Sequence, residues 1–205
     1  MKNTFSKGFT LVELLIVITI LAALAAAVVV VLNPAELLAQ ARDAQRMSDM
    51  TTMRDSINLL LSQVPAANIC FAAPACTAGG YCTAVGPAGN APFGGVSGLV
   101  CTVPTAANLR LIDGNGWVSA VFTAMPGGSP IAMLPVDPTN TTTFFYAYKS
   151  DTATRTFRLS TRLESVRHRT MMQNDGGPKS ACSAAPTWAA VDCFYEVGTN
   201  MLATF

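Results

Sequence analysis

The sequence predicts an α+β protein in which a long N-terminal α-helix precedes a small antiparallel β-sheet head. Residues 14–32 contain no charged side chain, and these 19 residues are long enough to cross a bilayer as a helix. Residues 35–64 contain neither Gly nor Pro, and their apolar side chains recur at steps of three or four, which predicts an amphipathic helix. Two β-rich runs at 144–148 and 157–161 flank a polar turn at 149–154 and predict a hairpin.

The composition favours an anchored protein with an ordinary folded domain. Of the 205 residues, 51% are hydrophobic and 12% are charged, and the formal net charge is +1. A near-neutral chain gives no reason to expect that its whole surface binds nucleic acid. The sequence also lacks the G-x-S-x-G, H-E-x-x-H and Walker patterns, and its only histidine is His168. We therefore expect no catalytic residue, no cofactor and no metal site.

All six cysteines follow the apolar run, and none of them belongs to a C-x-x-C pair. An even number of cysteines beyond a membrane segment predicts disulfides in an oxidising compartment. Six cysteines allow 15 pairings, between which the sequence does not choose, and buried free thiols are the alternative. The disulfide candidates are Cys70, Cys76, Cys82, Cys101, Cys182 and Cys193.

The N-terminal run contains one acidic side chain, Glu13, near its start. Lys2 and Lys7 precede the run and no positive charge directly follows it, so residues 1–8 are expected in the cytoplasm and the rest outside. An ordinary signal peptide, cleaved near Ala27, or a plain membrane anchor would leave Glu13 unexplained. A carboxylate costs about 2.5–3.5 kcal/mol at the centre of a membrane helix, and the helix dipole recovers only about 0.3–1 kcal/mol near the N-terminus.

The stretch "KGFTLVELL" (residues 7–15) resembles the class III signal of type IV pilins and of the pseudopilins of type II secretion. The resemblance implies that a prepilin peptidase cleaves between Gly8 and Phe9 and that Phe9 is then N-methylated. It further implies that Glu13 pairs with the Phe9 amine of a neighbouring subunit during assembly. Cleavage creates a cation at Phe9, which is the kind of partner that a buried carboxylate needs.

The resemblance also implies the organisation, the partners and the location of the chain. The expected parts are a leader peptide (1–8), a transmembrane and fibre-core helix (9–32), an amphipathic helix (33–64) and a globular β-rich head with disulfide-braced loops (65–205). The long helix is expected to pack on the sheet with its second half. The implied partners are identical subunits in a helical homopolymer, prepilin peptidase, the inner-membrane pilus assembly machinery and, before assembly, the membrane. The implied location is the cytoplasmic membrane, with the head outside the cytoplasm, and then an extracellular pilus fibre.

Features of the head bear on whether the chain is more similar to type IV pilins or to pseudopilins. An "LP-x-DP" segment at 134–138, a Tyr-x-Tyr run and a strand that ends in Leu-Glu resemble major pseudopilins. Cys182 and Cys193 bracket a loop of the size that some pilins close with a disulfide. We expect a structural subunit of a type IV pilus, with a pseudopilin of type II secretion as the alternative. A membrane-anchored binding domain that does not polymerise is the alternative of another class.

The helical region raises two more specific expectations. Asn33-Pro34 predicts either a kink or a second helix that begins at Pro34. Asp43, Arg46 and Asp49, at steps of three, are expected on the polar side of the helix. The expected apolar stripe consists of Leu37, Ala41, Ala44, Met47, Met50, Met53, Ile57, Leu60 and Val64.

Two segments of the head receive local predictions. "GWVSAVF" (residues 116–122) alternates in the manner of a half-buried strand. "VRHRT" (residues 166–170) is a basic cluster, and it is either a solvated loop or a patch for DNA or another anionic surface. DNA is therefore a further candidate partner.

Overall fold

The computed structural model describes residues 8–70, 80–84, 101–151, 154–177 and 193–199. The chain divides into two units, Met1–Leu38 and Ala39–Phe205, and each is described by itself. The first unit carries helix α1 (Leu11–Leu32) and the first residues of helix α2 (Pro34–Gln63). The second unit carries the rest of α2 and the β-rich head.

Helix α1 is apolar along most of its length, and residues 11–29 are long and apolar enough to form a candidate membrane span. The helix ends at Asn33, whose φ of 40° is left-handed, a conformation that asparagine tolerates better than most residues. Pro34 then begins α2, where its missing N–H costs nothing. The carbonyl of Asn33 accepts the first bonds of α2, from the N–H groups of Glu36 (3.0 Å) and Leu37 (3.3 Å). Of the two expectations for Asn33-Pro34, a second helix is therefore what the structure contains.

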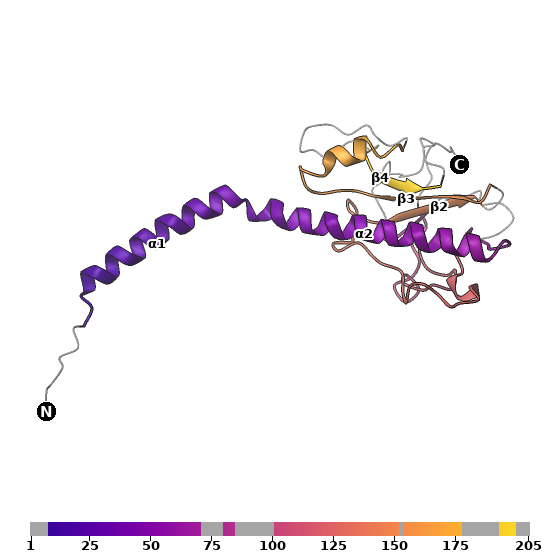
Figure 1. The fold of residues 1–205 in the computed structure, drawn as a ribbon, viewed down its shortest axis with the longest axis horizontal. Helices are drawn as coiled ribbons and strands as arrows, with labels where there is room; N and C mark the ends of the chain where they lie inside the picture. Colours follow the sequence, from indigo (N-terminus) through magenta and orange to yellow (C-terminus); the bar gives the residue numbers. More distant parts are fainter. Residues whose placement is uncertain (1–7, 71–79, 85–100, 152–153, 178–192, 200–205) are drawn as a thin grey trace, which may run out of the picture. The chain divides into compact units, whose positions relative to one another are not determined.

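The head contains a four-stranded antiparallel sheet in the order β1-β2-β3-β4. Figure 1 labels β2, β3 and β4 of this sheet. The predicted hairpin is confirmed, because Ala147 pairs with Ser160 and Asp151 pairs with Thr156. The first strand of the hairpin begins later than predicted, since residues 141–144 form a turn closed by Thr141 N–H and Phe144 O at 2.8 Å. The strands are β1 (Tyr81–Cys82), β2 (Ala147–Asp151), β3 (Thr156–Thr161) and β4 (Tyr195–Gly198).

One face of the sheet packs against α2, which lies alongside β2 and β3 in Figure 1. Phe157 and Leu159 are two residues apart on β3 and therefore point to the same face. Both belong to one core cluster with Met50, Met53 and other apolar residues of α2. The predicted α+β fold, a long N-terminal helix with a small antiparallel sheet, is thus confirmed.

The far end of α2 is joined to the hairpin by an arginine. Arg155 is the last residue of the turn between β2 and β3 and has a left-handed φ of 55°. Its guanidinium donates to Leu61 O at 2.6 Å and to Pro65 O. Carbonyls at a helix C-terminus lack intrahelical partners, and a cation there also suits the helix dipole. Arg155 therefore caps α2 from the sheet.

The prediction of a strand at residues 116–122 is wrong. The segment forms bends that lead into a short 3-10 helix, η1 (Phe122–Ala124). Trp117, Val118 and Ala120 are all buried, so the segment has no solvent face of the kind that a half-buried strand presents. A short apolar run has the same pattern in a strand and in a buried loop, which explains the error.

The predicted apolar stripe holds only for the second half of α2. Met50, Met53, Ile57 and Leu60 are fully buried, whereas Leu37, Ala41 and Ala44 are exposed. Towards its N-terminus the buried face continues through Arg46, Asp43 and Ala39. The placement of Asp43 and Arg46 on the polar side is therefore wrong, because both side chains are wholly buried.

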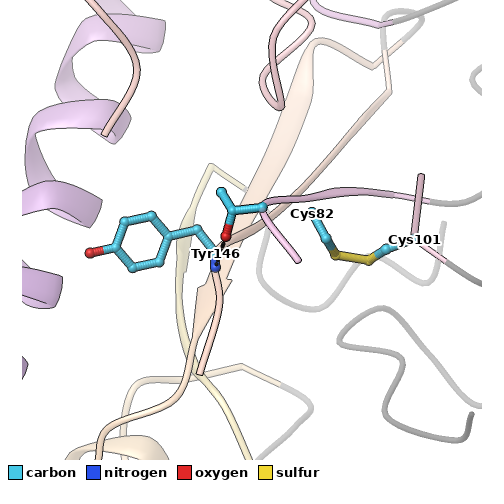
Figure 2. The surroundings of a disulfide bond; sticks show 4 residues. Cys82, Cys101 and Tyr146 are labelled. Atoms are coloured by element: carbon cyan, nitrogen blue, oxygen red, sulfur yellow. Dashed lines mark hydrogen bonds between the residues drawn. A yellow bond between two sulfur atoms is a disulfide. The ribbon is translucent and has the colours of Figure 1, made fainter. Parts of the chain in front are cut away.

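The structure contains a disulfide between Cys82 and Cys101, whose Cα atoms are 5.5 Å apart (Figure 2). Beside it, the Thr83 hydroxyl accepts the N–H of Tyr146 at 3.0 Å, and the Tyr146 ring points away from the disulfide. Cys70 and Cys193 are also disulfide-bonded. The predicted Cys182–Cys193 pair and Cys76 involve positions outside the described residues.

Candidate assembly site

Glu13 lies in the first turn of α1 and is hydrogen-bonded to Thr10. Thr10 is the extended N-cap residue, and its Oγ1 accepts the Glu13 N–H at 3.2 Å. In return, Glu13 Oε2 accepts the backbone N–H and the hydroxyl of Thr10, each at 2.9 Å. This reciprocal arrangement is a capping box, which satisfies donors at a helix start that have no intrahelical partner.

The capping box offsets part of the cost of a carboxylate in an apolar segment, since two donors of the same chain solvate it. Both of these bonds end on Oε2. Among the contacts of the described residues, Oε1 has no partner, so one carboxylate oxygen remains available to a cation. The site can therefore accept a further ionic partner without giving up the cap.

Gly8 and Phe9 precede α1 and are exposed. A side chain at Gly8 would meet no atom within 4 Å, and the Phe9 side chain is 87% exposed. The peptide bond that the resemblance marks for cleavage therefore lies outside the helix and is accessible in this unit.

The apolar side chains of α1 at residues 11–29, 31 and 32 are all exposed within their own unit. Leu11 is 84% exposed and Val17, one of the least exposed, is still 47% exposed. None of the candidate span at residues 11–29 is buried. An apolar helix that is exposed all round requires lipid or other protein around it.

The head contains a buried charged cluster that the sequence did not suggest. Arg46 is at its centre, with Nη1 at 2.9 Å from Asp43 Oδ1 and Nε at 2.7 Å from Asp137 Oδ2. Arg46 Nη1 also lies 3.4 Å from Glu164 Oε2, and the guanidinium stacks 4.8 Å from the centre of the Phe144 ring. Asp43 in turn accepts the backbone N–H groups of residues 164 and 165 at 2.8 and 2.7 Å. The cluster joins α2 to the loop before β2 and to the loop after β3.

The environment shifts the pKa values of two carboxyl groups of this cluster, Asp137 and Glu164, and of Asp49 on the same helix. Burial alone would raise the pKa of Asp137, but the hydrogen bonds and positive charge of Arg46 outweigh burial and lower it from its ordinary 3.8. The hydrogen bond from Arg42 is the main reason that the pKa of Glu164 is lowered from 4.5. Burial raises the pKa of Asp49, against the hydrogen bond from Tyr146 at 2.7 Å.

We expect the contribution of Asp137 to stability to disappear in acid. Its folded pKa lies below its unfolded value, so its stabilisation is complete above the unfolded pKa and is lost as the pH falls through the folded pKa. The difference in the free energy of unfolding between wild type and Asp137→Asn should therefore be largest above about pH 5 and shrink towards about pH 3. Denaturant titrations of the full chain in detergent at several pH values measure this difference.

Asp49→Asn is the matched control, because the pKa of Asp49 is shifted in the opposite direction. Because the folded pKa of Asp49 lies above its unfolded value, ionisation of Asp49 destabilises the wild type as the pH rises. The free energy of unfolding of Asp49→Asn should therefore increase relative to that of wild type with increasing pH. If the difference in the free energy of unfolding from wild type changed with pH in the same direction for Asp137→Asn and Asp49→Asn, this explanation of the cluster would be contradicted.

The described residues together define a class of protein, which has an exposed apolar N-terminal helix long enough to span a membrane, a carboxylate in the first turn of that helix and a small α+β head. Residues 4–29 match the family model of the prokaryotic N-terminal methylation motif, which is the class III signal peptide of type IV pilins and pseudopilins. The chain carries this motif, as the resemblance of residues 7–15 predicted. Comparisons with curated proteins and with solved structures gave no match.

Proposed function

We propose that this chain is a structural subunit of a type IV pilus, not an enzyme, and that it polymerises through its N-terminal helix into a surface fibre. Prepilin peptidase cleaves it between Gly8 and Phe9, and Phe9 is N-methylated. The observation that carries the proposal is Glu13, an acidic side chain in the first turn of an otherwise apolar and exposed helix.

The capping box does not require the negative charge of Glu13, and that charge has a use only if a cation reaches it. Cleavage creates a cationic amine at Phe9, and Glu13 Oε1 is the oxygen that the capping box does not occupy. In the fibre, the amine of a neighbouring subunit supplies this cation in a low-dielectric surrounding, where a charge without a partner is costly. Glu13 thereby favours the incorporation of subunits in one register.

Exposed apolar side chains continue beyond the candidate span of residues 11–29. Val31 is 80% exposed, Leu37 is 50% exposed and Leu38 is 60% exposed. These side chains need an apolar surface outside the bilayer. Identical helices supply that surface in a head-to-tail array, which forms an open helical filament when the rotation does not close.

The length and the cysteine content of the head favour a pilus, and the Cys82–Cys101 disulfide fits a head that lies in an oxidising compartment. A pseudopilin is the second candidate, and it is favoured by the "LP-x-DP" segment and the Leu-Glu that ends the β3 region. Asp137 and Glu164, the acidic residues of these two motifs, both contact Arg46.

Mass spectrometry of the mature chain tests the processing step. We expect an N-terminal, N-methylated Phe9. An N-terminus near Ala27 would instead establish ordinary signal-peptide cleavage and contradict the proposal.

Electron microscopy of sheared surface filaments, labelled with an antibody against the head, tests the assembly step. Labelled filaments outside the cell support the pilus. A pseudopilin would be favoured by two results together: the antibody labels only the cell envelope, and the secretion of other proteins depends on this chain. Processed chain that stays in the membrane and never forms filaments would favour an anchored binding domain.

A further inference from the structure

The segment that follows β3 exposes apolar and basic side chains side by side. Between Glu164 and Asp175 the chain contains Arg167, His168 and Arg169 and no acidic residue. Val166 is 67% exposed and Met171 is 44% exposed, and Arg167 between them is exposed as well. We call residues 166–171 the basic loop. Its last residues belong to a short 3-10 helix, η2 (Arg169–Gln173).

The basic loop is held at one end of the head by the Asp43 carboxylate. Asp43 accepts the N–H groups of Glu164 and Ser165, the two residues that precede the loop. Ser165 Oγ then accepts the N–H of His168 at 3.2 Å, and Met172, just after the loop, is fully buried. Asp43 lies only about one helical turn after Ala39, where the second unit begins. The loop is therefore held beside the first turns of α2 in the head.

A short tether connects this end of the head to the membrane anchor. The candidate span ends at Val29 and the second unit begins at Ala39. Ten residues separate these two points, so the connection reaches at most about 36 Å even when fully extended. A surface that is tethered to a bilayer in this way meets lipid at an effective concentration on the order of millimolar. Weak contacts are therefore sufficient for the surface to bind the bilayer.

The side chains of the loop have the chemistry of an interfacial contact. Apolar side chains enter the region between headgroups and acyl chains, and arginines bind anionic headgroups. DNA would use Arg167 but would leave exposed Val166 and Met171 without a role. We propose that the basic loop is a membrane-contact surface with which the head of the anchored, unassembled chain binds anionic phospholipid. The proposal rests on the membrane anchoring by α1, and it adds a second contact with the same bilayer.

The test uses the full chain in nanodiscs of dioleoylphosphatidylcholine, with or without about 30% dioleoylphosphatidylglycerol. Amide hydrogen exchange by mass spectrometry is followed in peptides that cover residues 164–172. We expect exchange there to be about fivefold slower in the anionic discs, because one arginine binds an anionic membrane surface about fivefold more strongly than a neutral one. Arg167→Gln and Val166→Ser should each remove the difference. Arg155→Gln, which removes an arginine beside Leu61 at the other end of the head's α2, should keep it.

Four results would overturn the inference. These are equal exchange in both kinds of disc, a lipid effect that persists in both loop variants, a lipid effect that Arg155→Gln abolishes, or slower exchange only when duplex DNA is added to neutral discs. The last result would assign the loop to nucleic acid. A chain that does not copurify with the discs would contradict the anchor itself, and with it the proposed function. A chain that stays in the discs without a lipid effect overturns only the role of the loop.

Discussion

Replacing Glu13 by Ala is expected to abolish fibre assembly while cleavage at Gly8 continues. The variant keeps the apolar helix and the exposed segment at residues 8–9, so it should be inserted and processed. It loses the carboxylate that we propose to pair with the amine of a neighbouring subunit, and losing one partner of a buried ion pair costs about 3–5 kcal/mol. Because this loss recurs at every subunit, we expect filament yield to fall below detection. Yield is measured by shearing, sedimentation and immunoblotting, and unchanged yield would remove our account of Glu13.

Glu13→Gln separates the capping role of this residue from its charge. Glutamine can replace glutamate in a capping box, so the start of α1 should remain intact. The side chain is no longer an anion and cannot neutralise the neighbouring amine. We expect Glu13→Gln to be as defective in assembly as Glu13→Ala. Normal fibres from Glu13→Gln would show that the cap, not the charge, is what assembly requires.

Replacing Arg46 by Leu is expected to cost about 3–5 kcal/mol of stability, because it leaves two buried carboxylates without their cation. Asp43 and Asp137 have fully buried side chains, and both are bonded to Arg46. The measurement is the free energy of unfolding of the full chain in detergent micelles, from denaturant titration monitored by tryptophan fluorescence.

Arg54→Leu is the matched control on the same helix. Arg54 also contacts an aspartate, Asp55 at 3.0 Å, but the two side chains are 41% and 62% exposed. An exposed pair of this kind contributes at most about 1 kcal/mol. In addition, Arg46→Leu combined with Asp137→Leu should be less damaging than the sum of the two single changes. Equal losses for Arg46→Leu and Arg54→Leu would contradict the structural role of the cluster.

The sequence predicted those parts of the fold whose signals are local. The uncharged run predicted α1, and Gly-free periodicity predicted α2. The polar turn between two β-rich runs predicted the β2–β3 hairpin. The Arg46 cluster was missed because its partners Asp137 and Glu164 are 91 and 118 residues away in the chain. One signal was present: a step of four and then a step of three backwards from Met50 reach positions 46 and 43, on the buried face.

For the candidate assembly site, too, the sequence predicted local features and not the contacts between distant residues or between copies. Glu13 was identified from its place in an apolar run, and Gly8 and Phe9 from the motif that the family model also matches. The capping box was missed, although Thr10 and Glu13 have the spacing that is typical of one. Which atoms would surround Glu13 in the proposed fibre depends on packing between copies, and no pattern within one chain encodes that geometry.

The buried charged cluster also has a mechanical consequence. In the filament that we propose, tension pulls each head through its helix, and the load enters α2 from its N-terminal side. Arg46 lies near that side, whereas Arg155 holds the opposite end of the helix at Leu61. With the helix fixed to the sheet at both ends, axial force loads these bonds together in shear and does not peel them apart one by one. The cluster would then carry the largest share of the strain, so the head should yield first where α2 meets Asp137 and Glu164.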